Sequence, residues 1–216
     1  MADAHDSDSS SPSASRMSRR AFLCGAGITA AGSALLDSGL LQEAHAVSLG
    51  ATSRGPGAVP ISLKVNGTAR AMQVEPRATL ADVLRDGLHL TGTKVICDRG
   101  VCSGCTVWLD GTPINSCMTF ALDVGNREVT TIEGLGPAGS VHPVQAAFVE
   151  HDALQCGYCT PGMVMSCAAL LAKNPNPTLA DVKHAVRGNL CRCGTYPKVF
   201  SATLDAAQAM RAGGSK

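Results

Sequence analysis

Aromatic residues are scarce in this sequence, and neither sign of charge prevails. Phe, Trp and Tyr make up only 3% of the 216 residues, whereas 45% are hydrophobic, so a core must be built mainly from aliphatic side chains. The formal net charge is +1 and no basic stretch occurs, which argues against nucleic acid as a partner. A chain of this length can form one or two small domains.

The sequence also lacks the residues of an active site for an organic substrate. It contains no nucleotide-binding fingerprint and no convincing acid–base constellation. His142 and His151 fall on an expected helix, and we interpret them as surface or capping residues rather than ligands. We therefore predict that this chain has no catalytic residues of its own.

The first 46 residues have the features of an export signal. Arg19 and Arg20 form a twin-arginine pair, followed by an apolar stretch over 21–36 and an Ala-x-Ala cleavage site ending at Ala46. At about 16 residues this stretch is short for a bilayer span, which needs about 20. We expect a twin-arginine signal peptide over 1–46, export of the folded chain to the periplasm, and no membrane span in the mature chain.

The first half of the mature chain has the pattern of a small sheet. Alternating apolar residues flank Asn-Gly at 66–67 and Asp-Gly at 110–111, and each pair predicts a hairpin turn. Between the hairpins, Thr79 is expected to cap a short amphipathic helix. A further strand is expected over 128–132. These elements predict a β-grasp-like sheet with one helix packed on it.

The second half has a helical pattern. Helices are expected in four segments: 142–154, 160–172, 178–186 and 199–211. Thr160 is the expected N-cap of the second helix, with Pro161 at its first helical position. The predicted class is therefore α+β, with a sheet domain followed by an all-α four-helix bundle. The expected divisions are a signal peptide at 1–46, a linker at 47–60, the sheet domain at 61–133, a linker at 134–140 and the helical domain at 141–216.

Nine cysteines follow the export signal, and four of them lie in the expected sheet domain. These four are Cys97, Cys102, Cys105 and Cys117. Their C-x4-C-x2-C…C spacing is that of plant-type [2Fe–2S] ferredoxins. Gly100 and Gly104 would let the loop wrap closely and turn its amides toward sulfide. Cys117 is expected on the strand after the second hairpin, where it would complete the set of iron ligands.

A second set of cysteines lies in the expected helical domain. It consists of Cys156 and Cys159 in "QCGYCTPG", with Cys191 and Cys193 in "NLCRC". Side chains two residues apart point about 200° apart on a helix and to opposite faces on a strand, so Cys191 and Cys193 cannot form a comfortable disulfide. A two-iron centre suits four such thiolates, because they need not converge on one ion. The helix beginning near Thr160 would direct its positive end toward this site.

Zinc and disulfides are the alternative uses of these cysteines. Structural zinc takes four thiolates, but usually from two C-x2-C pairs. A disulfide framework suits an oxidising compartment, although nine cysteines leave one unpaired. The ninth, Cys167, shares a helical stripe with Val164 and Leu171, so we interpret it as a core residue. The spacing leaves open an electron-transfer subunit, a free-standing periplasmic ferredoxin-type carrier and a zinc-stabilised interaction module.

The motifs "QCGYCTPGMVMS" and "GNLCRCGTY" together resemble the iron–sulfur subunit of the xanthine oxidase family of molybdenum hydroxylases. With its leader, the chain is most similar to the periplasmic aldehyde oxidoreductase iron–sulfur subunits of that family. The resemblance covers nearly all of 60–210. The chain departs from the family pattern at Ile96, where Gly is common, and at Ser103-Gly104, where Gly-x is common. These departures affect the loop of the first cluster and could shift its potential.

The resemblance implies an N-terminal ferredoxin-like domain and a C-terminal helical domain, each with one [2Fe–2S] cluster. Cys193 matches the family cysteine that lies against the pterin of the molybdenum cofactor, and Gln155 matches the glutamine that hydrogen-bonds it. A large partner subunit would hold the molybdopterin, and an FAD-binding medium subunit or a cytochrome would accept the electrons. The implied function is electron transfer from the molybdopterin through both clusters, with the helical-domain cluster first.

Overall fold

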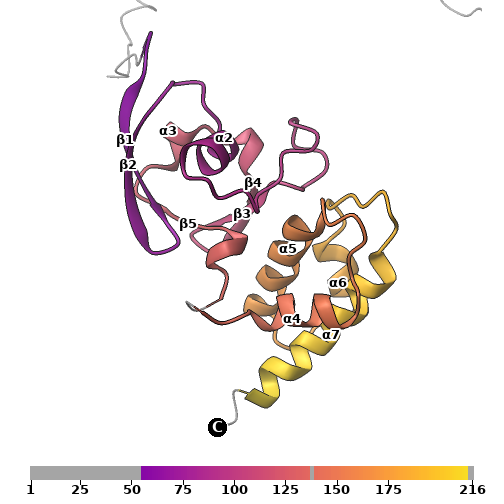
Figure 1. The fold of residues 1–216 in the computed structure, drawn as a ribbon. Coiled ribbons are helices and arrows are strands. Elements are labelled where there is room, and N and C mark those ends of the chain that lie inside the picture. The colour runs from indigo at the N-terminus through magenta and orange to yellow at the C-terminus, as the bar shows by residue number, and fades with distance from the viewer. Residues whose placement is uncertain (1–54, 137–138, 214–216) are drawn as a thin grey trace, which may run out of the picture. The chain divides into compact units, whose positions relative to one another are not determined.

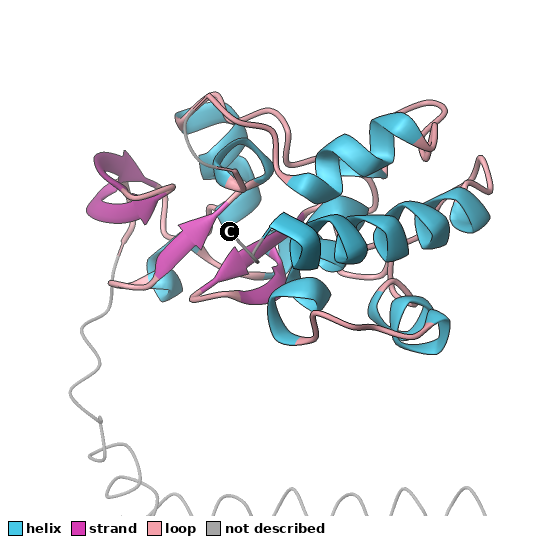
Figure 2. Ribbon diagram, turned by 90° about the horizontal axis from the view of Figure 1, so that it is seen from below, coloured by secondary structure: helices cyan, strands magenta, loops and turns pink. Residues whose placement is uncertain are grey.

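The computed structural model describes residues 55–136 and 139–213, in which a five-stranded sheet is followed by four longer α-helices (Figure 1). The strands and the longer helices gather in separate parts of the fold (Figure 2). This arrangement confirms the α+β prediction. The expected export signal at 1–46 lies outside the described residues. Within the described residues, no helix is long and apolar enough to cross a membrane.

The sheet is mixed and consists of two hairpins joined by a central strand. Its strands are β1 (Val59–Val65), β2 (Thr68–Val74), β3 (Thr106–Leu109), β4 (Thr112–Asn115) and β5 (Glu128–Thr130). The order across the sheet is β2-β1-β5-β3-β4, with β5 parallel to β1 and antiparallel to β3. Both predicted hairpins are present. Asn66 and Gly67 have φ of 50° and 76°, the left-handed values that a type I′ turn requires.

Strand β5 is shorter than the predicted segment 128–132. After Thr130, the backbone N–H of Thr131 donates to the side-chain oxygen of Asn66 at 2.9 Å rather than to a strand. The buried Thr131 hydroxyl also donates to Glu133 at 2.6 Å. These side-chain hydrogen bonds take the place of further backbone pairing in the sheet, and the 3-10 helix η4 (Ile132–Gly134) follows.

One helical segment packs on the sheet, as predicted. It begins as α2 (Leu80–Asp82), where Thr79 and Asp82 form a capping box, and widens into the π-helical turn η2 (Val83–Gly87). A short helix, α3 (Ala121–Val124), follows the second hairpin. Leu80, Val83 and Leu84 are buried among the sheet's inward-facing residues, including Leu63, Val107 and Val129. This apolar layer is the core of the N-terminal part.

The C-terminal part contains the four predicted helices. They are α4 (Pro143–Glu150), α5 (Thr160–Lys173), α6 (Leu179–Ala185) and α7 (Tyr196–Gly213). Every residue of α5 from 162 to 169 is buried, because α5 packs on β3 on one side and on the other three helices elsewhere (Figure 1). Cys167 is fully buried in this helix, which confirms its interpretation as a core residue.

Helix α5 begins one residue earlier than predicted. Thr160 is its first residue rather than its N-cap, and Cys159 occupies the cap position with helical φ and ψ of −83° and −14°. The backbone N–H of Thr160 already donates to the carbonyl of Gly157, so the preceding loop turns directly into the helix. His142 caps α4, with its Nδ1 accepting from the Val144 N–H at 3.2 Å, which confirms its capping role.

The sheet and the helices share a packed contact. The indole N–H of Trp108 on β3 donates to the carbonyl oxygen of Met165, in the middle of α5, at 2.9 Å. Ile132 and Leu135 also pack against the apolar core of the helices. The only tryptophan of the chain therefore lies at the contact between its two structural parts.

Candidate metal centres

The first four predicted ligands lie together. Cys97 and Cys102 lie close enough to influence each other's pKa, and Cys105 lies close enough to Cys117 to contribute to the raised pKa of Cys117. Cys97 is half-buried and the other three are buried. Cys117 lies in the 3-10 helix η3 (Ser116–Met118) rather than on a strand, because strand β4 ends at Asn115. The structure thus brings the set together by a loop and a helical turn.

Hydrogen bonds hold this loop against the end of β4. The Asn115 side-chain amide donates to the carbonyl of Gly100 at 2.9 Å, and the Ser116 hydroxyl donates to that of Cys105 at 2.7 Å. Gly100 has φ of +72°, a value that favours glycine, and its N–H is directed toward the Cys117 sulfur. The N–H of Gly104 is similarly directed toward the sulfur of Cys102. The loop therefore surrounds its thiols with amide donors, as the glycines predicted.

The electrostatic surroundings of this set suit a cationic group. Burial raises the pKa of Cys117 to about 12, so its thiolate needs a nearby positive charge. The hydrogen bond with Cys102, aided by backbone amides, lowers the pKa of Cys97 to about 7. Iron binding would displace the thiol protons and supply the missing positive charge.

The two departures from the family pattern occur in one well-packed loop. Ser103 adopts a left-handed φ of 50°, which explains why glycine is common at this position. The Ile96 side chain fills the space above Gly104, where a Cβ would lie only 2.4 Å from the Ile96 Cδ1 atom. Ile96 is therefore accommodated because residue 104 has no side chain.

The second set meets at the start of α5. Cys159 and Cys191 lie close enough to influence each other's pKa, and Cys156 lies close enough to Cys193 to influence the pKa of Cys193. Cys159 is buried, Cys191 is half-buried, and Cys156 and Cys193 are exposed. The two neighbours in "NLCRC" thus pair with different partners, as two irons with two thiolates each would require.

Burial and nearby hydrogen bonds shift the pKa values of the two less exposed cysteines of the second set, Cys159 and Cys191. Burial raises the pKa of Cys159 to about 12. Burial also opposes ionisation of Cys191, but hydrogen bonds led by that of the Thr195 side chain, at 3.3 Å, lower its pKa to about 7. The positive end of α5 begins directly after Cys159 and favours a thiolate there. The predicted helix terminus therefore lies beside the predicted ligands.

Both sets fit a [2Fe–2S] cluster by their donor chemistry. Each offers four thiols that lie near one another, and thiolates are the ligands of such clusters. Across residues 55–136 and 139–213, no three or more His, Cys, Asp or Glu side chains are arranged around a single metal position. Pairs of thiols are the arrangement that two neighbouring irons would use.

Gln155 and Cys193, the residues predicted to contact a pterin, line one cavity of about 330 Å³. Gln155 is exposed and precedes Cys156 directly. Lys198 and Asp152, which also line the cavity, form an ion pair of 2.5 Å. The cavity therefore opens beside the exposed side of the second thiol set.

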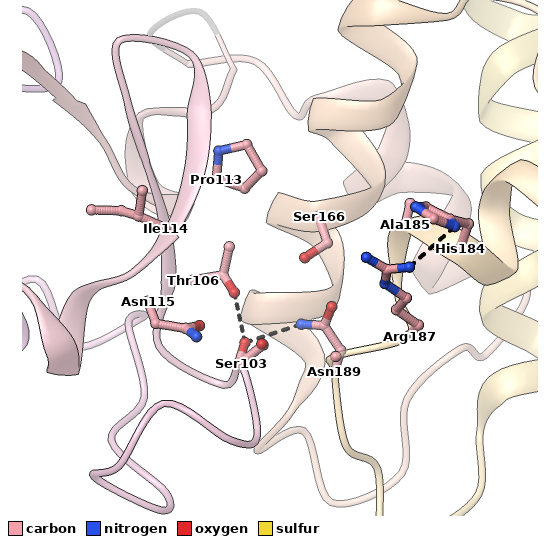
Figure 3. Close-up of a pocket in the computed structure, with 11 residues that line it drawn as sticks. Ser103, Thr106, Pro113, Ile114, Asn115, Ser166, His184, Ala185, Arg187 and Asn189 are labelled. Atoms are coloured by element: carbon pink, nitrogen blue, oxygen red, sulfur yellow. Dashed lines mark hydrogen bonds between the residues drawn. The ribbon is translucent and has the colours of Figure 1, made fainter.

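The two ligand loops touch each other. The backbone N–H of Leu190 donates to the carbonyl of Cys102 at 3.0 Å, and the Asn189 side-chain amide donates to that of Ser103 at 3.0 Å (Figure 3). The prediction from sequence assigned no role to Asn189, although it lies in the "GNLCRCGTY" motif. Its position two residues before a predicted ligand was the available signal.

Two four-thiol sites on adjoining domains define an iron–sulfur electron-transfer protein. Residues 63–128 match the family described as the 2Fe-2S iron-sulfur cluster binding domain, and residues 131–204 match the [2Fe-2S] binding domain family. The chain is 42% identical, over 75% of its length, to the aldehyde oxidoreductase iron-sulfur-binding subunit PaoA of Escherichia coli K12, covering 77% of that protein. It is 47% identical, over 68% of its length, to the nicotine 6-hydroxylase small subunit of Paenarthrobacter nicotinovorans, covering 89% of it.

Solved structures agree with this relationship. Quinoline 2-oxidoreductase from Pseudomonas putida 86 has a chain that is 42% identical, with a TM-score of 0.69 over 72% of this chain and 98% of that one. The aldehyde oxidoreductase of Desulfovibrio desulfuricans is 43% identical with a TM-score of 0.68, but this chain spans only 17% of it. The chain belongs to the iron–sulfur subunits of the molybdenum hydroxylases. It is the small electron-transfer subunit of a multi-subunit oxidoreductase and has two 2Fe-2S binding domains.

Proposed function

We propose that the chain receives electrons at the surface formed by Gln155 and Cys193 and releases them at the loop of 97–105. The observation that carries this proposal is the hydrogen bond from the Leu190 N–H to the Cys102 carbonyl. It connects the residue preceding Cys191 with a proposed ligand of the other set. The two sets are therefore joined through the main chain and one hydrogen bond.

The eight paired cysteines would hold the irons of two clusters, which supply one-electron transfer when bound. Cys193 would serve both as a ligand and as the contact to the pterin, because it is exposed and lines the cavity. The Gln155 amide, on the same cavity, would hydrogen-bond the pterin edge. Cys159 and Cys191 lie on the more buried side of this set, nearer to the loop of the first domain.

A large subunit that holds the molybdenum cofactor would cover the cavity, and an FAD-binding subunit or a cytochrome would contact the other loop. Val101 and Met118, both exposed and apolar, lie at that loop and leave an apolar surface for an acceptor protein. The name of the Escherichia coli relative supports an aldehyde as substrate. The twin-arginine motif at Arg19 and Arg20 supports export of the folded, cofactor-loaded chain to the periplasm.

Native purification tests the proposed partners. The chain should co-purify with a molybdenum-containing subunit, and the complex should oxidise an aldehyde. In the Gln155→Ala variant the complex should become less stable to dilution, because one contact to the pterin is lost, whereas Gln73→Ala, on the exposed face of β2, should have no effect. A chain that migrates as a monomer without molybdenum would instead indicate the free-standing carrier.

A further inference from the structure

Asn189 lies at the contact between the two ligand loops. Its side chain is only 3% exposed, and its Nδ2 donates to the Ser103 carbonyl in the loop of the first domain. Ser103 lies between two proposed ligands, Cys102 and Cys105, along the chain. The Asn189 amide, in the helical domain, therefore hydrogen-bonds directly to the ligand loop of the sheet domain.

The backbone of Asn189 is fixed to the second set. Its carbonyl oxygen accepts a hydrogen bond from the Tyr196 hydroxyl at 2.9 Å, and the same hydroxyl accepts from the N–H of Cys191 at 2.8 Å. The Asn189 N–H donates to the Val186 carbonyl at the end of α6. Asn189 thus connects Ser103 with the main chain of Cys191 through a small polar network.

The first turn of α5 also packs closely against the loop that contains Ser103. A Cβ on Gly162, in the first turn of α5, would lie 2.3 Å from the Ser103 carbonyl oxygen. On another side the contact borders a cavity of about 350 Å³, lined by Asn115, Ser166 and Arg187 among others (Figure 3). Because that side is open, apolar packing there cannot replace the Asn189 hydrogen bond.

We infer that Asn189 is a positioning residue that holds the two cluster loops together and so sets the electronic coupling between the two centres. It touches no reacting atom and acts through Ser103 and Leu190. This inference rests on the proposed ligand sets and adds a residue outside them. Its loss should leave both clusters in place and weaken the interaction between them.

The test is the electron paramagnetic resonance spectrum of the fully reduced, cluster-loaded chain. Two reduced centres joined by this contact should split each other's signals at low temperature. Asn189→Asp removes the amide donor and keeps the size of the side chain, so the splitting should decrease while the iron content stays unchanged. Asn174→Asp is the matched control: it makes the same change at the far end of α5 from Cys159, where the side-chain oxygen that accepts from the Asn176 N–H is kept, and it should keep the splitting.

A second variant tests the contact without placing a charge in it. Gly162→Ala should push the Ser103 carbonyl away and also decrease the splitting, whereas Gly213→Ala, whose new methyl group would meet nothing within 4 Å, should not. Splitting of wild-type size in both the Asn189 and Gly162 variants, or an equal decrease in the Asn174 variant, would overturn the inference. A chain without iron–sulfur signals would overturn the proposed ligands, and the inference with them.

Discussion

The backbone N–H of Leu190 donates a 3.0 Å hydrogen bond to the carbonyl oxygen of Cys102. Cys102 belongs to the thiol set of the sheet domain, and Leu190 directly precedes Cys191 of the other set. One hydrogen bond therefore joins the main chains of the two proposed centres. It places two small cofactor domains in contact at their ligand loops, as an electron relay requires.

Replacing the single tryptophan tests the contact between the domains. Trp108→Phe removes the hydrogen bond to the Met165 carbonyl, and the free energy of unfolding should fall by about 1 kcal/mol, the usual net value of such a bond. Urea unfolding followed by circular dichroism measures this change. Phe120→Leu, a substitution of an exposed aromatic residue in the same domain, serves as the control. An unchanged unfolding midpoint for Trp108→Phe would mean that the bond contributes nothing.

The close contact between Ile96 and Gly104 predicts that a Gly104→Ala variant is impaired and that a second substitution at Ile96 restores it. Gly104→Ala should drive a methyl group into the Ile96 side chain and destabilise the first ligand loop, by about 1–3 kcal/mol for overpacking of this kind. Iron content and the signal of the first cluster should fall. The double variant Ile96→Ala/Gly104→Ala should recover both, because the obstructing side chain is gone.

Gly87→Ala is the control for that experiment. The new methyl group would meet its nearest neighbours, in Met72 and Val83, at 3.9 Å, which is ordinary van der Waals contact. Iron loading should therefore stay at the wild-type level. A double variant that loads no better than Gly104→Ala alone would contradict the coupling between Ile96 and Gly104.

The cap of α4 predicts a pH dependence of stability. Burial lowers the pKa of His142, and its neutral ring accepts the hydrogen bond from Val144. The stabilisation is therefore complete above about pH 6.5, the ordinary value for His, and is lost as the pH falls through the lower pKa of the folded state. Unfolding of wild type and His142→Asn should be compared between pH 7.5 and 5.5.

The wild type should lose more stability than His142→Asn over that range, because Asn caps a helix without titrating. Comparing the two proteins cancels the contribution of groups common to both. Equal losses of unfolding free energy in wild type and variant would show that protonation of His142 does not weaken the helix cap.

The proposed export signal predicts that the twin-arginine pair directs the chain to the periplasm. Changing Arg19 and Arg20 together to Lys should retain the chain in the cytoplasm, since the pathway reads the arginine pair rather than the charge. Cell fractionation and immunoblotting measure the distribution. Arg16→Lys is the matched control and should be exported normally. Periplasmic chain in the double variant would point to another export route.

Cysteine spacing predicted two sets of four thiols. The C-x4-C-x2-C run and each of the two later pairs place their cysteines in short loops, but the approach of the two later pairs to each other does not follow from local geometry. Turn chemistry likewise predicted both hairpins, because Asn66-Gly67 and Asp110-Gly111 favour left-handed backbone. These features depend on neighbours along the chain.

The contacts between the domains could not be predicted in this way. The bonds from Trp108 to Met165 and from Asn189 to Ser103 join residues 57 and 86 positions apart, and no local pattern specifies such partners. The predicted end of β5 was also wrong, because the N–H of Thr131 donates to the side chain of Asn66, which lies in a turn distant in sequence. Long-range hydrogen bonds of side chains decided each of these cases.

The proposed entry of electrons at Cys193 is tested most directly by reduction of the clusters in the assembled complex. Absorbance changes should be followed after mixing with an aldehyde substrate and, separately, with dithionite. Cys193→Ser should slow reduction by the aldehyde far more than reduction by dithionite, whereas Cys191→Ser, which changes a proposed ligand only, should affect both alike. Equal slowing of both reactions by Cys193→Ser would contradict entry at this residue.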